Sequence, residues 1–174
     1  LLVLLVLLVV IGLLLPDSAR VERSTLINAA PEIVFPHINS MRRFHAWSPW
    51  TDLDPNTKYR FTGPESGVGS RMAWASGSAE LGQGSQEIIA SDPPNSVEMR
   101  LEFGDAGEGS AVLALSPEGR GTRVTWRFET GFGWDLFGRY VGLMLDAMIG
   151  TAYDRGLATL RQQVESGEPG AAKG

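Results

Sequence analysis

The stretch VERSTLINAAPEIVF, residues 21–35, decides the fold that the sequence predicts. Residues 20–28 alternate between polar and apolar side chains and include β-branched ones, which is typical of a strand. Pro31 then opens a helix, because a proline in the first turn of a helix loses no hydrogen bond there. Pro36 should end or kink this helix, and Ser40 can cap a second short one. The sequence therefore predicts a first strand followed by two short helices.

The middle of the chain is predicted to be a series of short strands. Six segments alternate in polarity, and turn sequences such as SDPPN and SPEGRG separate them. Sequential strands that are joined by tight turns form an antiparallel meander. No long helical segment interrupts them, which argues against a parallel βαβ topology. The six segments are residues 58–62, 70–75, 84–90, 96–103, 111–115 and 122–130.

The last element is predicted to be a long helix over residues 135–165. Its apolar residues recur at helical spacing, but the phase slips near Gly150, so we expect a kink or break there. Residues 166–174 have the composition of a flexible tail. Together the elements predict one α+β domain over residues 20–165. It is a curved antiparallel sheet of about seven strands, with two short helices after strand 1, wrapped on a long C-terminal helix.

Period-2 alternation shows which strand residues share a face of the predicted sheet. Met72 and Trp74 point to one side, while the residues next to them point to the other. A curved sheet with this face inward and the long helix laid across it would enclose Trp, Met and Phe side chains together. Later strands place further large apolar residues on a face of the same kind, namely Met99, Leu101, Phe103, Val124, Trp126 and Phe128.

Several stretches are similar to one known superfamily. Besides residues 21–35, they are AWSPW (46–50), GSRMAWAS (69–76) followed by GQGSQEI (82–88), GTRVTWRF (121–128), and GRYVGLMLDAMIGTAYDRGLATLR (138–161). Residues 20–165 thereby resemble the SRPBCC (START-like, Bet v 1-like) superfamily, and within it the polyketide cyclase/dehydrase-like, membrane-anchored bacterial subgroup. The resemblance implies a helix-grip fold. It does not specify a reaction, because the superfamily includes lipid carriers, hormone receptors and cyclases.

The resemblance and the inner face together predict a binding site for a small hydrophobic or lipid-like molecule. We expect an internal cavity of roughly 300–1,000 Å³ between the sheet and the long helix, the usual size of small-molecule sites. Glycines on the helix and at positions 82 and 84 remove side-chain volume there. The residues expected to line the cavity are Trp50, Met72, Trp74, Met99, Leu101, Trp126, Tyr140, Met144 and Met148.

Two other functions stay open at this stage. The domain could be a cyclase or dehydrase type of enzyme that uses a pocket acid such as Asp146 together with Tyr140. A carboxylate at the position of Asp146 more often pairs with an arginine or faces water. The domain could instead be a ligand-sensing or protein-interaction module with a filled core. Trp47 and Trp50 either anchor the turn around Pro49 or form a lid over a ligand, and for Trp47 the anchor is favoured.

Composition and motifs argue against several classes of function. The net charge is −5 and the isoelectric point is about 5.0, so a nucleic-acid partner is not expected. The chain has no cysteine, which removes disulfides and thiolate metal sites. His37 and His45 have no partners at a metal-ligand spacing, so no metal site is predicted. No glycine cluster forms a dinucleotide-binding fingerprint, and no cofactor is expected.

Residues 1–15, LLVLLVLLVVIGLLL, contain no polar side chain. A spanning helix needs about 20 apolar residues, so the run is predicted to be part of a truncated transmembrane anchor. Residues 16–19 would link it to the domain. We therefore expect a single-pass membrane protein that contacts the membrane through this helix, with the domain on an undetermined side. The alternative is a cleaved secretory signal, for which Asp17 makes a poor cleavage site.

Overall fold

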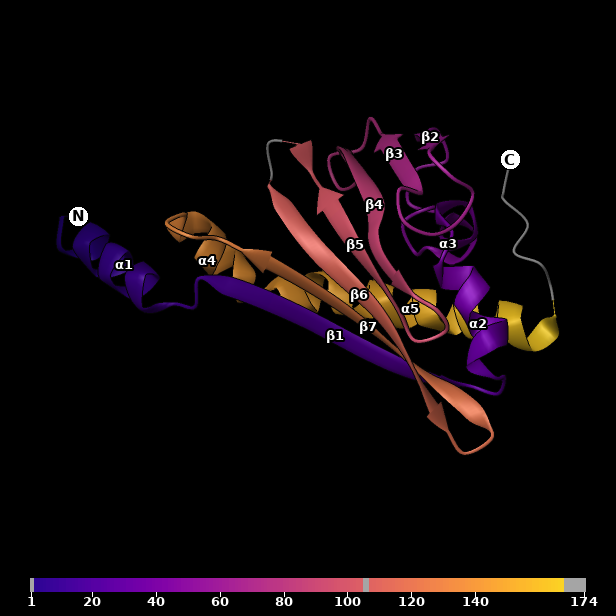
Figure 1. The fold of residues 1–174 in the computed structure, drawn as a ribbon. Coiled ribbons are helices and arrows are strands. Elements are labelled where there is room, and N and C mark those ends of the chain that lie inside the picture. Colours follow the sequence, from indigo (N-terminus) through magenta and orange to yellow (C-terminus); the bar gives the residue numbers. More distant parts are fainter. Residues whose placement is uncertain (1, 105–106, 168–174) are drawn as a thin grey trace.

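The computed structural model describes residues 2–104 and 107–167, and Figure 1 shows how their helices and strands are arranged. The helices are α1 (Leu2–Leu14), α2 (Pro31–Ile38), α3 (Met41–Trp47), α4 (Leu136–Gly142) and α5 (Leu145–Ser166). The strands are β1 (Ser18–Ile27), β2 (Lys58–Thr62), β3 (Arg71–Ala75), β4 (Gln83–Asp92), β5 (Ser96–Glu102), β6 (Glu108–Glu118) and β7 (Gly121–Gly131).

The strands form one seven-stranded antiparallel sheet in the order β1-β7-β6-β5-β4-β3-β2. Strands β2 to β7 follow one another as a meander, and β1 pairs with β7 from Ser18 opposite Gly131 to Ile27 opposite Thr122. The long helix α5 lies along β1, while α2 contacts β6 and β7 and α3 contacts β3 and β4 (Figure 1). The predicted α+β helix-grip fold is therefore confirmed.

The core lies between the inner face of the sheet and the helices. Alternation assigned Met72, Met99 and Trp126 to an inner face, and these residues are at most 4% exposed. The helix α5 is amphipathic: its apolar residues form a buried stripe at helical spacing, and its other face carries charged residues. This stripe consists of Tyr153, Leu157, Leu160 and Val164.

The two indoles of AWSPW have different places. Trp47 is 1% exposed, and its indole N–H donates a hydrogen bond of 3.0 Å to the carbonyl oxygen of His37. Its one polar group is thereby satisfied inside the core. Pro49 packs on α5 at Gly156, where a Cβ atom would lie 2.9 Å from the proline Cδ. Trp50 is half-buried and packs against the edge of the core. The segment therefore anchors α3 and the turn that follows it to α5.

The C-terminal helix breaks at residues 143–144 and not near Gly150, so this part of the prediction is wrong. Before the break, α4 contacts α1, and the ring of Phe132 lies where a Cβ at Gly138 would be. After the break, α5 packs on β1, and Gly150 lies inside the helix against the guanidinium of Arg23. Both helices contact β1, but α4 contacts α1 most and α5 contacts β1 most, which one straight helix could not provide.

Two predictions concern the ends of the chain: a membrane anchor at the N-terminus and a flexible tail at the C-terminus. The helix α1 has 13 residues, or about 20 Å at 1.5 Å per residue, whereas the hydrocarbon core of a bilayer is about 30 Å thick. Among the described residues, no helix is long and apolar enough to cross a membrane. The prediction of a single-pass membrane anchor is therefore wrong. Of the predicted tail at residues 166–174, positions 168–174 lie outside the described residues.

Candidate functional site

The predicted lining residues of the sheet lie on its inner face. Met72, Met99 and Trp126 are 4%, 0% and 2% exposed and belong to the closed core. Trp74 and Leu101 are only half-buried and pack against that core, and Trp50 is half-buried as well. The inner face therefore has a fully packed part and a part that is incompletely covered.

The predicted lining residues of the C-terminal helix do not lie against the inner face of the sheet. Met144 and Met148 are 62% and 59% exposed. The hydroxyl of Tyr140 donates a hydrogen bond of 2.6 Å to a backbone carbonyl oxygen of α1. In their place, Leu145 and Ile149 pack half-buried against the core. Leu145 and Ile149 lie eight and four residues before Tyr153, so they extend the buried stripe of α5 toward its N-terminus. This helical spacing could have been read from the sequence.

A cluster of aromatic rings fills the space between α5 and β7. The Tyr153 ring stacks on Trp126, with centroids 3.7 Å apart and an angle of 13° between the planes. Phe44 and Trp47 of α3 meet the same indole edge-on, at 5.6 and 5.2 Å. Burial raises the pKa of the Tyr153 hydroxyl, because the phenolate would lose its hydration there. This part of the interior holds packed side chains.

The incompletely covered part of the inner face is also aromatic. The ring centroids of Trp74 and Phe103 are 6.2 Å apart, and Phe103 is again 6.2 Å from Phe128. Phe103 and Leu101 lie two residues apart, so they share a face, and both are half-buried. Phe128 pairs with Val21, which places this aromatic row at the end of the sheet where β1 begins. Phe103 was not among the predicted lining residues.

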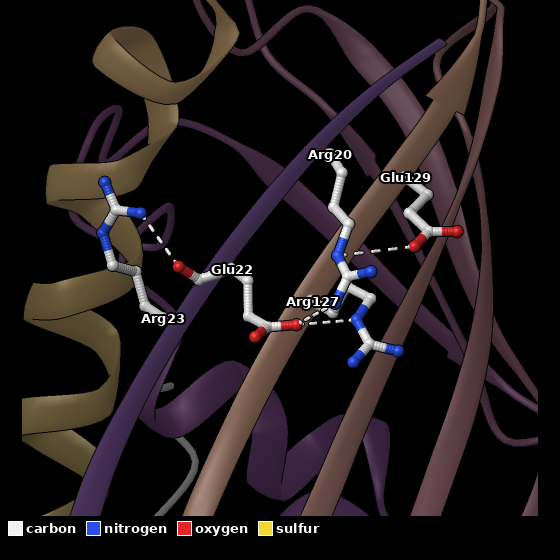
Figure 2. A network of polar contacts seen from close by, with 5 residues as sticks. All are labelled: Arg20, Glu22, Arg23, Arg127 and Glu129. Atoms are coloured by element: carbon white, nitrogen blue, oxygen red, sulfur yellow. Dashed lines mark hydrogen bonds and ion pairs between the residues drawn. The ribbon is translucent and has the colours of Figure 1, made fainter.

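Arg23 holds the beginning of α5 at the same end of the sheet. Its guanidinium binds both carboxylate oxygens of Asp146 at 2.8 and 2.9 Å and one oxygen of Asp154 at 3.3 Å. This ion pair explains why a carboxylate interrupts an apolar helical run. Figure 2 shows Arg23 beside α5, where its guanidinium also donates a hydrogen bond of 2.9 Å to the backbone carbonyl oxygen of Glu22. The carboxylate of Glu22 belongs to a network of side-chain ion pairs along β1 and β7. That network consists of Arg20, Glu22, Arg127 and Glu129.

The two candidate catalytic residues contact different elements. The hydrogen bond from Arg23 lowers the pKa of Asp146, so this carboxyl group is ionised near neutral pH and is a poor proton donor. Tyr140 is instead bound to α1. Within residues 2–104 and 107–167, no group of three or more His, Asp or Glu side chains could hold a metal ion. The geometry thus offers no assembled acid–base pair at these positions.

Aromatic rings occupy the volume that inner-face glycines leave free. A Cβ at Gly84 would lie 2.5 Å from the indole of Trp74, and one at Gly109 would lie 2.5 Å from the ring of Phe128. Interiors are packed to high density, so a missing side chain next to a ring usually makes room for that ring. These glycines therefore position the aromatic row.

Four of the hollows on the surface of the described residues have volumes of about 450, 600, 50 and 410 Å³. None of these four is lined by Trp126, Met99 or Tyr153. The internal cavity between the sheet and α5 therefore stays a prediction. The hollow of about 600 Å³ lies near the C-terminal end of α5.

A curved sheet that grips one long helix, with two short helices after its first strand, defines the helix-grip class of domains. Residues 18–165 match the family described as "Polyketide cyclase / dehydrase and lipid transport". The chain belongs to this family, and the SRPBCC superfamily predicted from the sequence is confirmed. The family description suggests hydrophobic ligands.

Solved structures with the same fold include norcoclaurine synthase from Thalictrum flavum in complex with dopamine and hydroxybenzaldehyde. Its TM-score is 0.65 at 12% identity, over 90% of this chain and 92% of that one. A Staphylococcus aureus protein of unknown function has a TM-score of 0.63 at 9% identity, over 87% and 96%. The Aha1 dimer from Colwellia psychrerythraea has 0.58 at 15% identity, over 86% and 98%. Such identities show the fold alone. No curated protein matches the chain.

Proposed function

We propose that this domain binds a small hydrophobic or lipid-like molecule against the incompletely covered end of the inner face. The family description, which joins polyketide cyclases and dehydrases with lipid transport, supports an apolar or aromatic ligand. The observation that carries the proposal is the group of Trp74, Leu101 and Phe103. These side chains are apolar, half-buried and share one face of the sheet.

The chemistry of this group favours an apolar ligand. Removing apolar surface from water stabilises a complex by about 25 cal/mol per Å². The single polar group of Trp74 is already satisfied, because its indole N–H donates a hydrogen bond of 3.1 Å to the carbonyl oxygen of Leu81. On α5, Leu145 and Ile149 are likewise apolar and half-buried against the core. A ligand bound here therefore needs no charged partner.

Titration of the 174-residue chain with a fluorescent fatty acid tests the proposal. We expect saturable binding by the wild type and binding that is at least about tenfold weaker in Phe103→Ala, because the variant lacks the contact area of one ring. Phe137→Ala is the matched control, since that ring lies on α4 and is 78% exposed. Urea unfolding verifies that both variants are folded. A lack of saturable binding, or an equal loss in both variants, would contradict the proposal.

Two results would favour the other functions. Conversion of the bound molecule that disappears in Asp146→Asn would favour an enzyme of the cyclase or dehydrase type. A folded chain that binds no apolar probe and carries no small molecule in native mass spectrometry would favour a protein-interaction module. A co-purified apolar molecule in the same spectrum would give the class of the ligand directly.

A further inference from the structure

We propose a second ligand site, for a phosphate group, in a groove beside the last turns of α5. The groove has a volume of about 600 Å³. Three segments form it: the end of β1, the hairpin turn between β6 and β7, and α5 at residues 161 and 165. This site is independent of the proposed function, because Trp74, Leu101 and Phe103 do not line it.

Two arginines without partners line the groove. Arg120 lies in the hairpin turn and Arg161 on α5, and both side chains are exposed. Within the described part of the chain, neither guanidinium makes a hydrogen bond or an ion pair. A guanidinium presents its N–H donors in a planar fork that matches two oxygens of a phosphate. Both arginines are therefore available to an anionic ligand.

The two carboxylates of the groove are already engaged. Glu118 binds Arg123 through both of its oxygens, at 2.5 and 2.6 Å. This contact lowers the pKa of Glu118. Glu165 accepts a hydrogen bond of 2.9 Å from the backbone N–H of Asn28. Neither carboxylate is paired with Arg120 or Arg161.

The charge balance of the groove favours an anion. The lining residues alone carry two arginines and two glutamates, which balance. Arg123 lies outside the lining and pairs with Glu118, so the groove together with Arg123 carries a net charge of +1. The whole chain carries −5. A local positive charge in a hollow concentrates small anions, even on an acidic molecule.

Contacts between the end of β1 and the beginning of β7 fix the backbone that forms the groove. The hydroxyl of Thr122 donates a hydrogen bond of 2.7 Å to the carbonyl oxygen of Ala29, which holds the chain after β1 against β7. A Cβ at Gly121 would lie 2.4 Å from the carbonyl oxygen of Ile27, so the two strands approach closely there because of the glycine. Leu26 is 43% exposed and adds an apolar wall. A phosphomonoester with a small organic part therefore fits the groove better than inorganic phosphate does.

An NMR titration that follows the arginine Nε–H signals of the 174-residue chain tests this site. Glycerol phosphate and inorganic phosphate are the two ligands, and sodium chloride at matched ionic strength is the blank. We expect saturable shifts of Arg120 and Arg161, with tighter binding of glycerol phosphate. In Arg161→Gln the affinity should fall about tenfold, because one charge-assisted contact is lost. Arg155→Gln is the matched control, since Arg155 is an exposed arginine on the same helix outside the groove.

The outcomes separate a specific site from general ionic attraction. Saturable shifts with inorganic phosphate alone would support the site and identify free phosphate as its ligand. Arg161→Lys should bind with intermediate affinity, because it keeps the charge but loses the planar fork. Shifts that sodium chloride reproduces, or an equal loss of affinity in Arg155→Gln and Arg161→Gln, would overturn the proposal.

Discussion

At the scale of single residues, two glycines of α5 have different neighbours. A Cβ at Gly156 would lie 2.9 Å from the Cδ of Pro49 and 3.1 Å from the ring of Trp126. A Cβ at Gly150 would lie 2.1 Å from the guanidinium nitrogen Nη2 of Arg23. Proline and indole rings cannot move without displacing the core, whereas the end of an arginine side chain can rotate away.

The substitution Gly156→Ala should therefore destabilise the domain. Alanine gains about 1 kcal/mol of helix propensity over glycine. Overpacking of a tight site costs about 1–3 kcal/mol, so we expect a net loss of up to about 2 kcal/mol in the free energy of unfolding. Urea unfolding measures this change. Gly150→Ala is the matched control and should cost less. A Gly156→Ala variant that is more stable than the wild type would show that the packing against Pro49 is loose.

The buried hydroxyl of Tyr153 should make stability depend on alkaline pH. Burial raises its pKa above the unfolded value of about 10. The folded state then holds this proton more tightly than the unfolded state does. The resulting stability is fully present below about pH 10 and is lost as the pH rises from there toward the folded pKa. In Tyr153→Phe we expect a shallower fall of the free energy of unfolding above about pH 10, measured by urea unfolding at several pH values. An unchanged slope would argue against this ionisation.

At the scale of elements, the beginning of α5 is held by charge more than by burial. The first fully buried residue of this helix is Gly150, whereas Leu145 and Ile149 are half-buried. Arg23 bridges the carboxylates of Asp146 and Asp154 across this stretch. Because the pair is partly exposed, it guides the position of the helix end without dominating global stability.

Replacing Arg23 by glutamine should loosen the first turns of α5 selectively. We expect faster amide hydrogen exchange at residues 145–150 and unchanged exchange at residues 157–164, whose side chains form the buried stripe. High salt should have the same effect on the wild type, because it screens the pair. Arg127→Gln is the matched control, since Arg127 pairs with the carboxylate of Glu22 and not with an acidic residue of α5 (Figure 2). Uniformly faster exchange along α5 would contradict the local role of Arg23.

At the scale of the whole molecule, α1 extends away from the sheet and packs beside α4 (Figure 1). Arg139 of α4 donates hydrogen bonds to the carbonyl oxygens of Leu13 and Leu15 at 3.2 and 3.1 Å, near the end of α1. Most side chains of α1 are exposed, and none belongs to the core cluster. The domain therefore has its own core, to which α1 adds little.

Removal of residues 1–16 should leave the domain folded. We expect the free energy of unfolding to change by less than about 1 kcal/mol, as for other changes outside the core. Urea unfolding followed by tryptophan fluorescence measures this value, because Trp47 and Trp126 report the core. A truncated chain that fails to unfold cooperatively would show that α1 contributes to the core after all.

Most of the fold was predictable because its signals are local. Alternating polarity and turn residues predicted all the strands in order, and residues 58–62 coincide with β2. The site was less predictable. Alternation placed Trp74, Leu101 and Phe103 on the inner face, but Phe103 was not chosen as a lining residue. Only the contacts of its ring with Trp74 and Phe128 show that it belongs to the aromatic row. Met144 and Met148 look like pocket residues by side-chain type, yet they are exposed.

The sequence by itself determined the class of fold, the order of its elements and the inner face of the sheet, because these depend on residues close together in the chain. Only the tertiary structure decided which side of α5 faces the sheet and where the helix breaks. It also paired Asp146 with Arg23, which lies 123 positions away, and engaged Tyr140 with α1. The physical reason is that these features depend on which distant surfaces meet. An apolar stripe shows which face of a helix is buried, but it does not show which other element covers that face.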